Sequence, residues 1–359
     1  MADILFSGCR SGRFPLEYAR KHPEDSITVH AYDCYQARKV CEDNGRRRRN
    51  VEVVCAAGLP EGAVYSEAFY YATSKLVSAE LELDTLQDIY LHLADGAQFT
   101  TEGVEPDTLA KIGFGKISSS RASRRAPVKC VCLKKGDLKR VRSFAAEFEA
   151  SVPGGEKLKF MSLPGCFCHR RPDEGGLSLA EVVSKGIAES ELEKEGSVPV
   201  LDIGCGCGLV GLLVADVLRR KGMKDFPVAL VDSHSRAIAA SRHNADALGI
   251  SAECILSDTG LAEDHPLRGK FKIALANPPY YGEGRIADLF AEIAAASLAP
   301  DGVCWMVAKS PDIIKEACGK FFGKVDVLKR RGYTVLRAWK IDDVERRIAH
   351  AGVEMRTCL

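Results

Sequence analysis

The sequence lacks any long apolar stretch. No run of about 18 apolar residues occurs among its 359 residues, and a helix needs such a run to cross a membrane. The first residues, MADILFSGCRSG, also lack the basic, apolar and small-residue regions of a secretory signal peptide. We therefore expect a cytoplasmic protein with no membrane partner.

The sequence also has no excess of charge of one sign. Lys and Arg together number 50, Asp and Glu together number 49, and the formal net charge is +1. This balance does not indicate a nucleic-acid partner. It does not exclude one either, because a local basic face is sufficient to bind phosphates.

The cysteines lack the spacing that is typical of a zinc site. Zinc sites usually show a C-x2-C pair followed by a second matching pair. The 14 cysteines of this chain instead include three C-x-C pairs, which are Cys130/Cys132, Cys166/Cys168 and Cys205/Cys207. In a cytosolic chain of this length we expect reduced thiols that pack as small apolar side chains, and we predict no metal.

Strand and helix patterns alternate in the second half of the chain. Short apolar runs that are typical of buried strands cover residues 197–203, 227–231, 251–256, 271–276 and 303–308. Helical patterns cover residues 209–221, 235–248 and 286–298, and residues 325–340 fit two strands around an Arg-Gly turn. This alternation predicts an α/β fold with a mainly parallel sheet, whose ligands bind at the carboxyl ends of the strands.

The first half repeats this plan in altered form. Residues 4–12, ILFSGCRSG, align with residues 200–208, VLDIGCGCG, when Gly8 is placed on Gly204. The apolar run 27–32 ends at Asp33, as the run 227–231 ends at Asp232. Two unrelated α/β domains could share such features by chance, but the ordered matches favour a duplication.

The two copies differ where ligand chemistry is expected. Phe6 replaces Asp202, and Arg10 replaces Gly206, where a side chain would crowd a ligand. Residues 71–75 fall about where residues 277–280 are expected. We therefore predict a first domain at 1–150 that keeps the fold without its active site, a junction at 151–197, a catalytic domain at 198–340 and a tail at 341–359 of unassigned role.

A glycine loop follows the first strand of the second domain. Gly204, Gly206 and Gly208 let the backbone turn tightly and approach a ligand, and the helix behind them offers free amide groups. The run Gly206-x-Gly208-x-x-Gly211, with an acid about 20 residues later, also satisfies the dinucleotide-binding fingerprint. A nicotinamide domain, however, does not require the additional acids at 202 and 258.

These acids fit S-adenosylmethionine, which carries a sulfonium, an amino acid moiety, a ribose diol and an adenine but no phosphate. Asp202 would supply charge near the loop, Asp232 would accept the ribose hydroxyls, and Asp258 would accept the adenine amino group. The alternative is that each acid only caps the helix that follows it.

The run Asn277-Pro278-Pro279-Tyr280 ends another strand. The prolines restrict the backbone, so the Asn277 amide oxygen and the Pro278 carbonyl form two fixed acceptors. Two such acceptors suit a planar amine: they take its two N–H groups, orient its lone pair toward a methyl donor, and require no strong base. Tyr280 offers a flat face for stacking. The alternative is a simple strand stop.

With these motifs, residues 198–340 resemble a class I S-adenosylmethionine-dependent methyltransferase of the amino-methylating type. The junction, with LPGCFCHRRPDEGG at 163–176, extends the resemblance to the bacterial ribosomal RNA guanine-N2 methyltransferases, in which a degenerate copy precedes a working one. The resemblance implies two tandem Rossmann-like domains with seven-stranded, mostly parallel sheets. It also implies S-adenosylmethionine as cofactor, with Phe167 and Asp173 near its entrance. The predicted cofactor contacts are Asp202, Gly204, Gly206, Gly208, Asp232, Asp258, Asn277 and Phe167, and the predicted catalytic residues are Asn277, Pro278, Pro279 and Tyr280.

The resemblance implies methyl transfer to the N2 amine of a guanine in ribosomal RNA or a ribosomal particle. The family usually has Phe and His after the two prolines, whereas Tyr280 and Tyr281 stand here. Methylation of a protein glutamine amide or an adenine N6 amine therefore remains an alternative, as does a non-catalytic RNA-binding or ribosome-assembly protein. We expect a monomer, because an internal duplication removes one reason to form a homodimer.

Basic residues gather in three clusters. A charge run is more often a solvated face than a binding site. Two of the clusters lie in the half that lacks an active site, which suits a module that grips RNA through its phosphates. The target base would then have to be unstacked or flipped. The predicted RNA contacts are Arg46, Arg47, Arg48, Arg49, Arg121, Arg124 and Arg125; the third cluster is Lys329-Arg330-Arg331.

Overall fold

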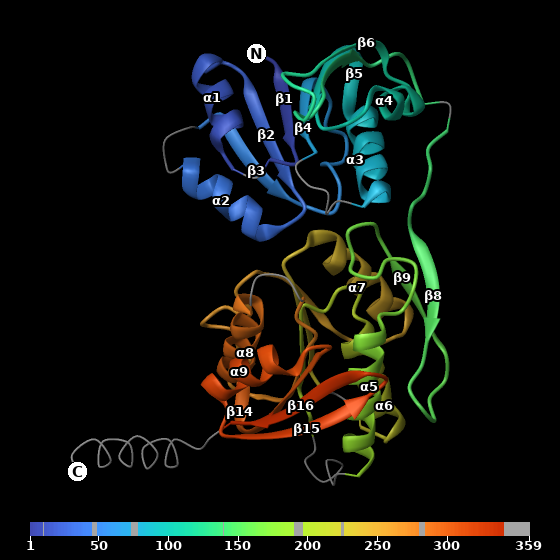
Figure 1. Cartoon of the computed structure of the whole chain (residues 1–359), viewed down its shortest axis with the longest axis vertical. Coiled ribbons are helices and arrows are strands. Elements are labelled where there is room, and N and C mark those ends of the chain that lie inside the picture. Colours follow the sequence, from blue (N-terminus) through green and yellow to red (C-terminus); the bar gives the residue numbers. More distant parts are fainter. Residues whose placement is uncertain are drawn as a thin grey trace, which may run out of the picture. The chain divides into compact units, whose positions relative to one another are not determined.

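A computed structural model shows two compact units (Figure 1). The first consists of Met1–Ala146 with the short segments Leu163–Cys166 and Ser233–Arg236. The second consists of Glu147–Ser162, Phe167–Asp232 and the chain from Ala237 onward. The structure describes residues 1–9, 11–44, 49–72, 78–138, 140–189, 197–223, 226–279 and 284–340. The tail 341–359 therefore lies outside the described residues.

The first unit is built on a seven-stranded sheet with the order β3-β2-β1-β4-β5-β7-β6. The strands from β3 to β5 are parallel, and β7 is antiparallel to both of its neighbours. Its elements are β1 (Asp3–Ser7), α1 (Arg13–Lys21), β2 (Ser26–Ala31), α2 (Cys34–Asn44), β3 (Val51–Cys55), β4 (Tyr65–Tyr71), α3 (Ala79–His92), β5 (Leu93–Glu102), α4 (Pro106–Ile112), β6 (Gly115–Ser120) and β7 (Lys129–Leu133).

The second unit contains a seven-stranded sheet with the order β12-β11-β10-β13-β14-β16-β15, next to a β8-β9 pair. Its elements are β8 (Ala146–Ala150), β9 (Leu158–Ser162), α5 (Glu174–Ala188), β10 (Val200–Ile203), α6 (Leu209–Arg220), β11 (Val228–Asp232), α7 (Ser235–Ala247), β12 (Glu253–Leu256), β13 (Phe271–Ala276), α8 (Arg285–Ser297), β14 (Leu298–Ala308), α9 (Pro311–Phe321), β15 (Lys324–Arg330) and β16 (Tyr333–Trp339). None of the helices in the described chain is long and apolar enough to span a membrane.

Side-chain alternation along the strands fixes the layers of the second unit. Successive strand residues point to opposite faces of a sheet. In β10, Leu201 and Ile203 join the core beneath α8 and α9, while Asp202 faces α6. All four residues of β10 are buried, as expected for a parallel strand that is covered on both faces.

The two sheets have the same strand order and the same register around their inner strands. Ser7 of β1 pairs with Tyr70 of β4, and Ile203 of β10 pairs with Ala276 of β13. Ser7 and Ile203 occupy equivalent positions when Gly8 is placed on Gly204, so Tyr71 is the counterpart of Asn277. The structure thus confirms the predicted pair of tandem, mostly parallel seven-stranded domains.

Two arginines of the third basic cluster are held within the second unit. The side chain of Glu181 on α5 is only 4% exposed. Its Oε2 accepts a hydrogen bond from Arg330 Nε at 2.5 Å, and its Oε1 accepts one from Arg331 Nη2 at 2.5 Å. These arginines fix the β15–β16 hairpin on α5.

Candidate active site

The predicted site residues of the second unit meet at one edge of its sheet. Ile203 pairs with Val231 on one side and with Ala276 on the other. The residues that come next along the three strands, Gly204, Asp232 and Asn277, therefore share the carboxyl edge. The chain order reverses between β10 and β13, and a ligand crevice is expected at such a switch point.

Asp258 lies at the outer end of this row. Asp232 pairs with Leu256 of β12, and the Ser257 N–H donates to the Asp232 carbonyl over 2.9 Å. Asp258 follows at once and is half-buried. The spatial order along the edge is thus Asp258, Asp232, the glycine loop and Asn277.

All three loop glycines have positive φ, but they have different surroundings. The φ angles of Gly204, Gly206 and Gly208 are 68°, 57° and 82°. A Cβ at Gly204 would lie 2.7 Å from the Phe290 ring, and one at Gly208 would lie 2.9 Å from Leu212 Cδ1. A Cβ at Gly206 would meet no atom of the described residues within 4 Å. The outer glycines are therefore needed for packing, while Gly206 faces open space.

Asp232 and α7 hold this loop from two sides. The Gly206 N–H donates to Asp232 Oδ2 over 2.9 Å, and Ser241 Oγ donates to the Gly206 carbonyl over 2.7 Å. Asn244 Nδ2 donates to the carbonyls of Cys207 and Met161 at 2.9 and 2.8 Å. The sequence analysis missed Ser241 and Asn244. In the sequence, their only signal is that two polar residues stand three apart and so share one face of the predicted helix. The structure shows that both are buried.

Asp202 lies beneath the loop and is buried. Its Oδ2 accepts a hydrogen bond from the Gly211 N–H in the first turn of α6 over 2.8 Å. Asp202 therefore accepts a hydrogen bond from the helix that follows it, which agrees with the alternative interpretation of this acid as a helix cap. A Cβ at Gly211 would lie 2.6 Å from Leu230 and 3.0 Å from Asp202, so this glycine of the fingerprint permits close helix–strand packing.

The pKa of the Asp202 carboxyl is raised from 3.8 to about 7, mainly because the group is buried; the Gly211 N–H opposes this rise and nearby Asp232 adds to it. Between pH 3.8 and about pH 7, Asp202 keeps its proton in the folded protein but has lost it in the unfolded chain. The stability of the cofactor-free protein should therefore fall by roughly 3–5 kcal/mol as pH rises from about 4 to about 8. Asp202→Asn should remove this part of the slope. Urea unfolding of both proteins across this pH range checks it, and identical slopes would contradict the shift.

The Asn277 side chain lies against the N-terminus of α5. Its Nδ2 donates to Asp173 Oδ2 over 2.7 Å, and the same oxygen accepts the Gly176 N–H over 2.6 Å. Pro278 is buried and Pro279 is half-buried, whereas Tyr280 lies outside the described residues. Phe167 is 64% exposed, and its predicted place at the cofactor entrance stays a prediction.

The predicted RNA contacts lie in the first unit. Arg46, Arg47 and Arg48 fall outside the described residues, and Arg49 is exposed. Arg124 and Arg125 are exposed in the segment between β6 and β7. Arg121 is also exposed, and its Nη2 pairs with Glu105 Oε1 at 2.6 Å.

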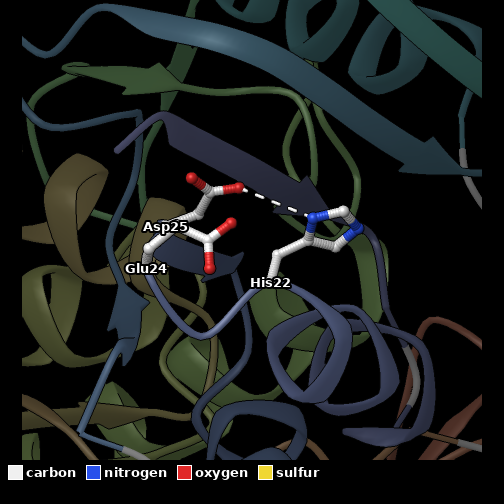
Figure 2. A group of neighbouring side chains, drawn as sticks. All are labelled: His22, Glu24 and Asp25. Carbon is white, nitrogen blue, oxygen red and sulfur yellow. Dashed lines mark ion pairs between the residues drawn. The ribbon is translucent and has the colours of Figure 1, made fainter.

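The first unit also contains a group that could hold a metal ion (Figure 2). It consists of His22, Glu24 and Asp25 in the connection between α1 and β2. Asp25 Oδ1 accepts the Ala2 N–H over 2.8 Å, and His22 stacks on Tyr18. This connection enters the amino end of β2, opposite to the edge where ligands are expected. These contacts give the group a structural role without an ion.

The cysteines that the structure describes take part in no comparable group. Those that the structure describes are all thiols, and most of them are buried. Among the described residues, the potential metal cluster contains no cysteine. In β7, Cys130 and Cys132 are both buried among apolar side chains, whereas Cys168 is half-buried and its thiol donates to Asp173 Oδ1 over 3.5 Å.

A family model described as the methyltransferase small domain matches residues 157–337, about half of the chain. The chain belongs to this family. The matched range runs from β9 through the glycine loop and Asn277 to β16, so it contains the whole edge described above. The family and the fold confirm the prediction of a class I S-adenosylmethionine-dependent methyltransferase, with S-adenosylmethionine as cofactor.

Curated relatives extend the likeness beyond the family domain. The ribosomal RNA small subunit methyltransferase C of Pseudomonas putida is 30% identical over 259 residues, which are 71% of this chain and 69% of that protein. The protein of the same name from Chromohalobacter salexigens is 28% identical over 188 residues. That match covers 50% of this chain and 52% of the relative, so the chain spans only about half of that relative's length.

One solved structure resembles nearly the whole chain. The Thermus thermophilus 16S rRNA N2 G1207 methyltransferase (RsmC), in complex with AdoMet and guanosine, superimposes with a TM-score of 0.73. The match covers 95% of this chain and 88% of that chain, at 20% sequence identity. The likeness establishes that the fold of the two units is shared.

Proposed function

We propose that the protein transfers a methyl group from S-adenosylmethionine to the exocyclic N2 amine of a guanine in ribosomal RNA. The observation that carries this proposal is the position of Asn277 beside the glycine loop at the switch point, with its amide NH2 held by Asp173. The names of the relatives support ribosomal RNA as the substrate.

The cofactor site follows from the row of residues along the sheet edge. Asp258 would accept the adenine amine, Asp232 would accept the ribose hydroxyls, and the methionine part would lie over the open side of Gly206. Asp202 supports the loop from below through Gly211 and, when ionised, would add negative charge near the cofactor's amino group. Phe167 would lie at the entrance. Bound S-adenosylmethionine supplies an activated methyl group, so no cysteine or histidine nucleophile is required.

The acceptor site is formed by Asn277 and the two prolines. A guanine N2 amine is conjugated with the ring and is therefore a weak nucleophile. The Asn277 oxygen and the Pro278 carbonyl accept its N–H groups and orient it, and Tyr280 would stack on the base. This pair of acceptors would also fit an adenine N6 amine or a glutamine amide, which the test below distinguishes.

The first unit would grip the RNA. Phe6 and Tyr71 replace the acid and the asparagine of the second unit, so we assign the first unit no catalysis. The exposed Arg49, Arg124 and Arg125 would contact phosphates, together with Arg46–Arg48. We propose that the protein works as a cytoplasmic monomer, on free ribosomal RNA or on a ribosomal particle.

The test is transfer of tritiated methyl from S-adenosylmethionine to ribosomal RNA from cells that lack the protein. Free RNA and purified subunits are both offered, and the labelled nucleosides are separated. We expect label in N2-methylguanosine. Label in N6-methyladenosine, or only in protein, refutes the guanine assignment. Cofactor binding without any transfer favours a non-catalytic assembly protein.

A further inference from the structure

Asp173 makes contacts that its sequence position alone does not reveal. It is the N-cap residue of α5, and its Oδ2 accepts the Gly176 N–H at 2.6 Å. The same oxygen accepts Asn277 Nδ2 at 2.7 Å, across 104 positions of sequence. One carboxylate oxygen thus joins the start of a helix to the residue that ends β13.

The chemistry of the carboxylate fixes which way the Asn277 amide is turned. An ionised carboxylate only accepts hydrogen bonds, whereas an asparagine side chain carries an NH2 on one side and an oxygen on the other. The NH2 of Asn277 must therefore face Asp173, and Oδ1 must be turned away from it. A Cβ at Gly175 would lie 3.4 Å from Asn277 Oδ1. Because glycine has no side chain, there is space beside this oxygen.

We infer that Asp173 is a positioning residue, which holds the Asn277 amide so that its oxygen faces the target amine. This inference rests on the proposed function. If the amide turned over, Asn277 would present N–H groups to the N–H groups of the substrate. The acceptor pair would then be lost although every catalytic residue is still in place.

Capping alone does not account for an aspartate at this position. Serine caps a helix about as well as aspartate and asparagine do. A serine at 173 could accept the Gly176 N–H, but its side chain is one bond shorter and would not reach Asn277. Asparagine has the full length. The bonds from Gly176 and Asn277 both go to Oδ2, so the single carbonyl oxygen of asparagine can accept both. Its NH2 then takes the place of Oδ1, which among the described residues accepts only the 3.5 Å contact from Cys168 Sγ.

These differences define a matched pair of variants, Asp173→Ser and Asp173→Asn. Both should keep the helix cap, and hence a melting temperature close to that of the wild type, and their kinetics are compared at saturating S-adenosylmethionine. Asp173→Ser should lower kcat by about 10- to 100-fold, because a misplaced catalytic group costs that much, with little change in KM for RNA. Asp173→Asn should restore kcat to within about threefold of the wild type. Methylation kinetics on ribosomal RNA provide both constants.

A second readout does not depend on activity. The chain has only four asparagines, at positions 44, 50, 244 and 277. Selective ¹⁵N-asparagine labelling therefore gives four side-chain amide pairs in the wild type and in Asp173→Ser, and five in Asp173→Asn. Asn277→Ala, made in the wild type and in Asp173→Asn, identifies the pair of interest. Its amide protons should exchange slowly with solvent in the wild type and in Asp173→Asn, and quickly in Asp173→Ser.

The outcomes separate this inference from the proposed function. Wild-type kcat in Asp173→Ser, or unchanged exchange of the Asn277 amide, overturns the positioning role even if the wild type methylates RNA. A loss of kcat in both variants together with a lower melting temperature shows a structural role and also overturns it. If the wild type methylates no RNA, the proposed function fails, and the amide exchange still decides whether Asp173 holds Asn277.

Discussion

Replacing Asn277 by alanine should lower kcat for methyl transfer by about 100- to 1,000-fold, the usual cost of removing one fixed polar group that stabilises a transition state. The variant should fold normally, because Asn277 is only half-buried and lies after the end of β13. Single-turnover transfer with saturating S-adenosylmethionine and RNA measures the chemical step directly. Activity within about threefold of the wild type would remove Asn277 from the reaction.

Two further variants control this result. Asn50→Ala makes the same change in the first unit, where the Asn50 side-chain amide donates to the carbonyls of His22 and Asp25, and it should leave kcat unchanged. Asn277→Asp keeps an oxygen acceptor but places a second carboxylate against Asp173. Like charges that share a site raise a pKa, so this variant should be weak at neutral pH and regain activity as the pH falls.

A pair of glycine substitutions should separate cofactor binding from stability. Gly206→Asn places a side chain in open space, and asparagine tolerates positive φ better than other side chains. It should cost little stability but weaken S-adenosylmethionine binding by about 100-fold, because the side chain fills the cofactor's place. Gly204→Ala pushes a methyl group into Phe290 at 2.7 Å, and should cost roughly 2–4 kcal/mol of stability.

Calorimetric titration with S-adenosylmethionine and thermal unfolding test this pair. We expect opposite effects. Gly206→Asn should bind S-adenosylmethionine weakly but have a melting temperature close to that of the wild type. Gly204→Ala should have a lower melting temperature. Normal affinity in Gly206→Asn would mean that the cofactor does not lie over this glycine. Wild-type stability in Gly204→Ala would mean that the Phe290 ring moves aside at little cost.

The sequence predicted those features of the fold and the site in which the local backbone conformation requires a particular residue type. Glycines at positive φ, prolines that stop a strand and acids at strand ends are local signals, and they located the loop, Asp232, Asp258 and Asn277 on one edge. The duplication was predicted for the same reason, since its markers are short motifs that recur in the same order along the chain. The antiparallel hairpin at the end of the second sheet was also anticipated.

Features that depend on distant partners were not predicted. The basic run at Lys329–Arg331 gives no sign that Glu181, about 150 positions earlier, holds two of its arginines. Nothing local marks Asn244 as the residue that joins β9 to the glycine loop. Helices α5 and α9 were not predicted: the junction was interpreted as a connection, and no helix was assigned between residues 308 and 325. Asp173 was noticed only through a resemblance, and its bond to Asn277 is visible only in three dimensions.

Because the two sheets have the same strand order, a strand of one unit could pair with strands of the other during folding. β1 and β10 have equivalent neighbours, so each could insert into the wrong sheet while the chain refolds. The divergent pair Phe6 and Asp202 works against such an exchange. In the place of β1, Asp202 would face the ring of Phe69 without the N–H of Gly211, and a buried unpaired carboxylate is strongly unfavourable. In the place of β10, the ring of Phe6 would collide with the close-packed start of α6. The difference between Phe6 and Asp202 thus favours the insertion of each strand into its own sheet.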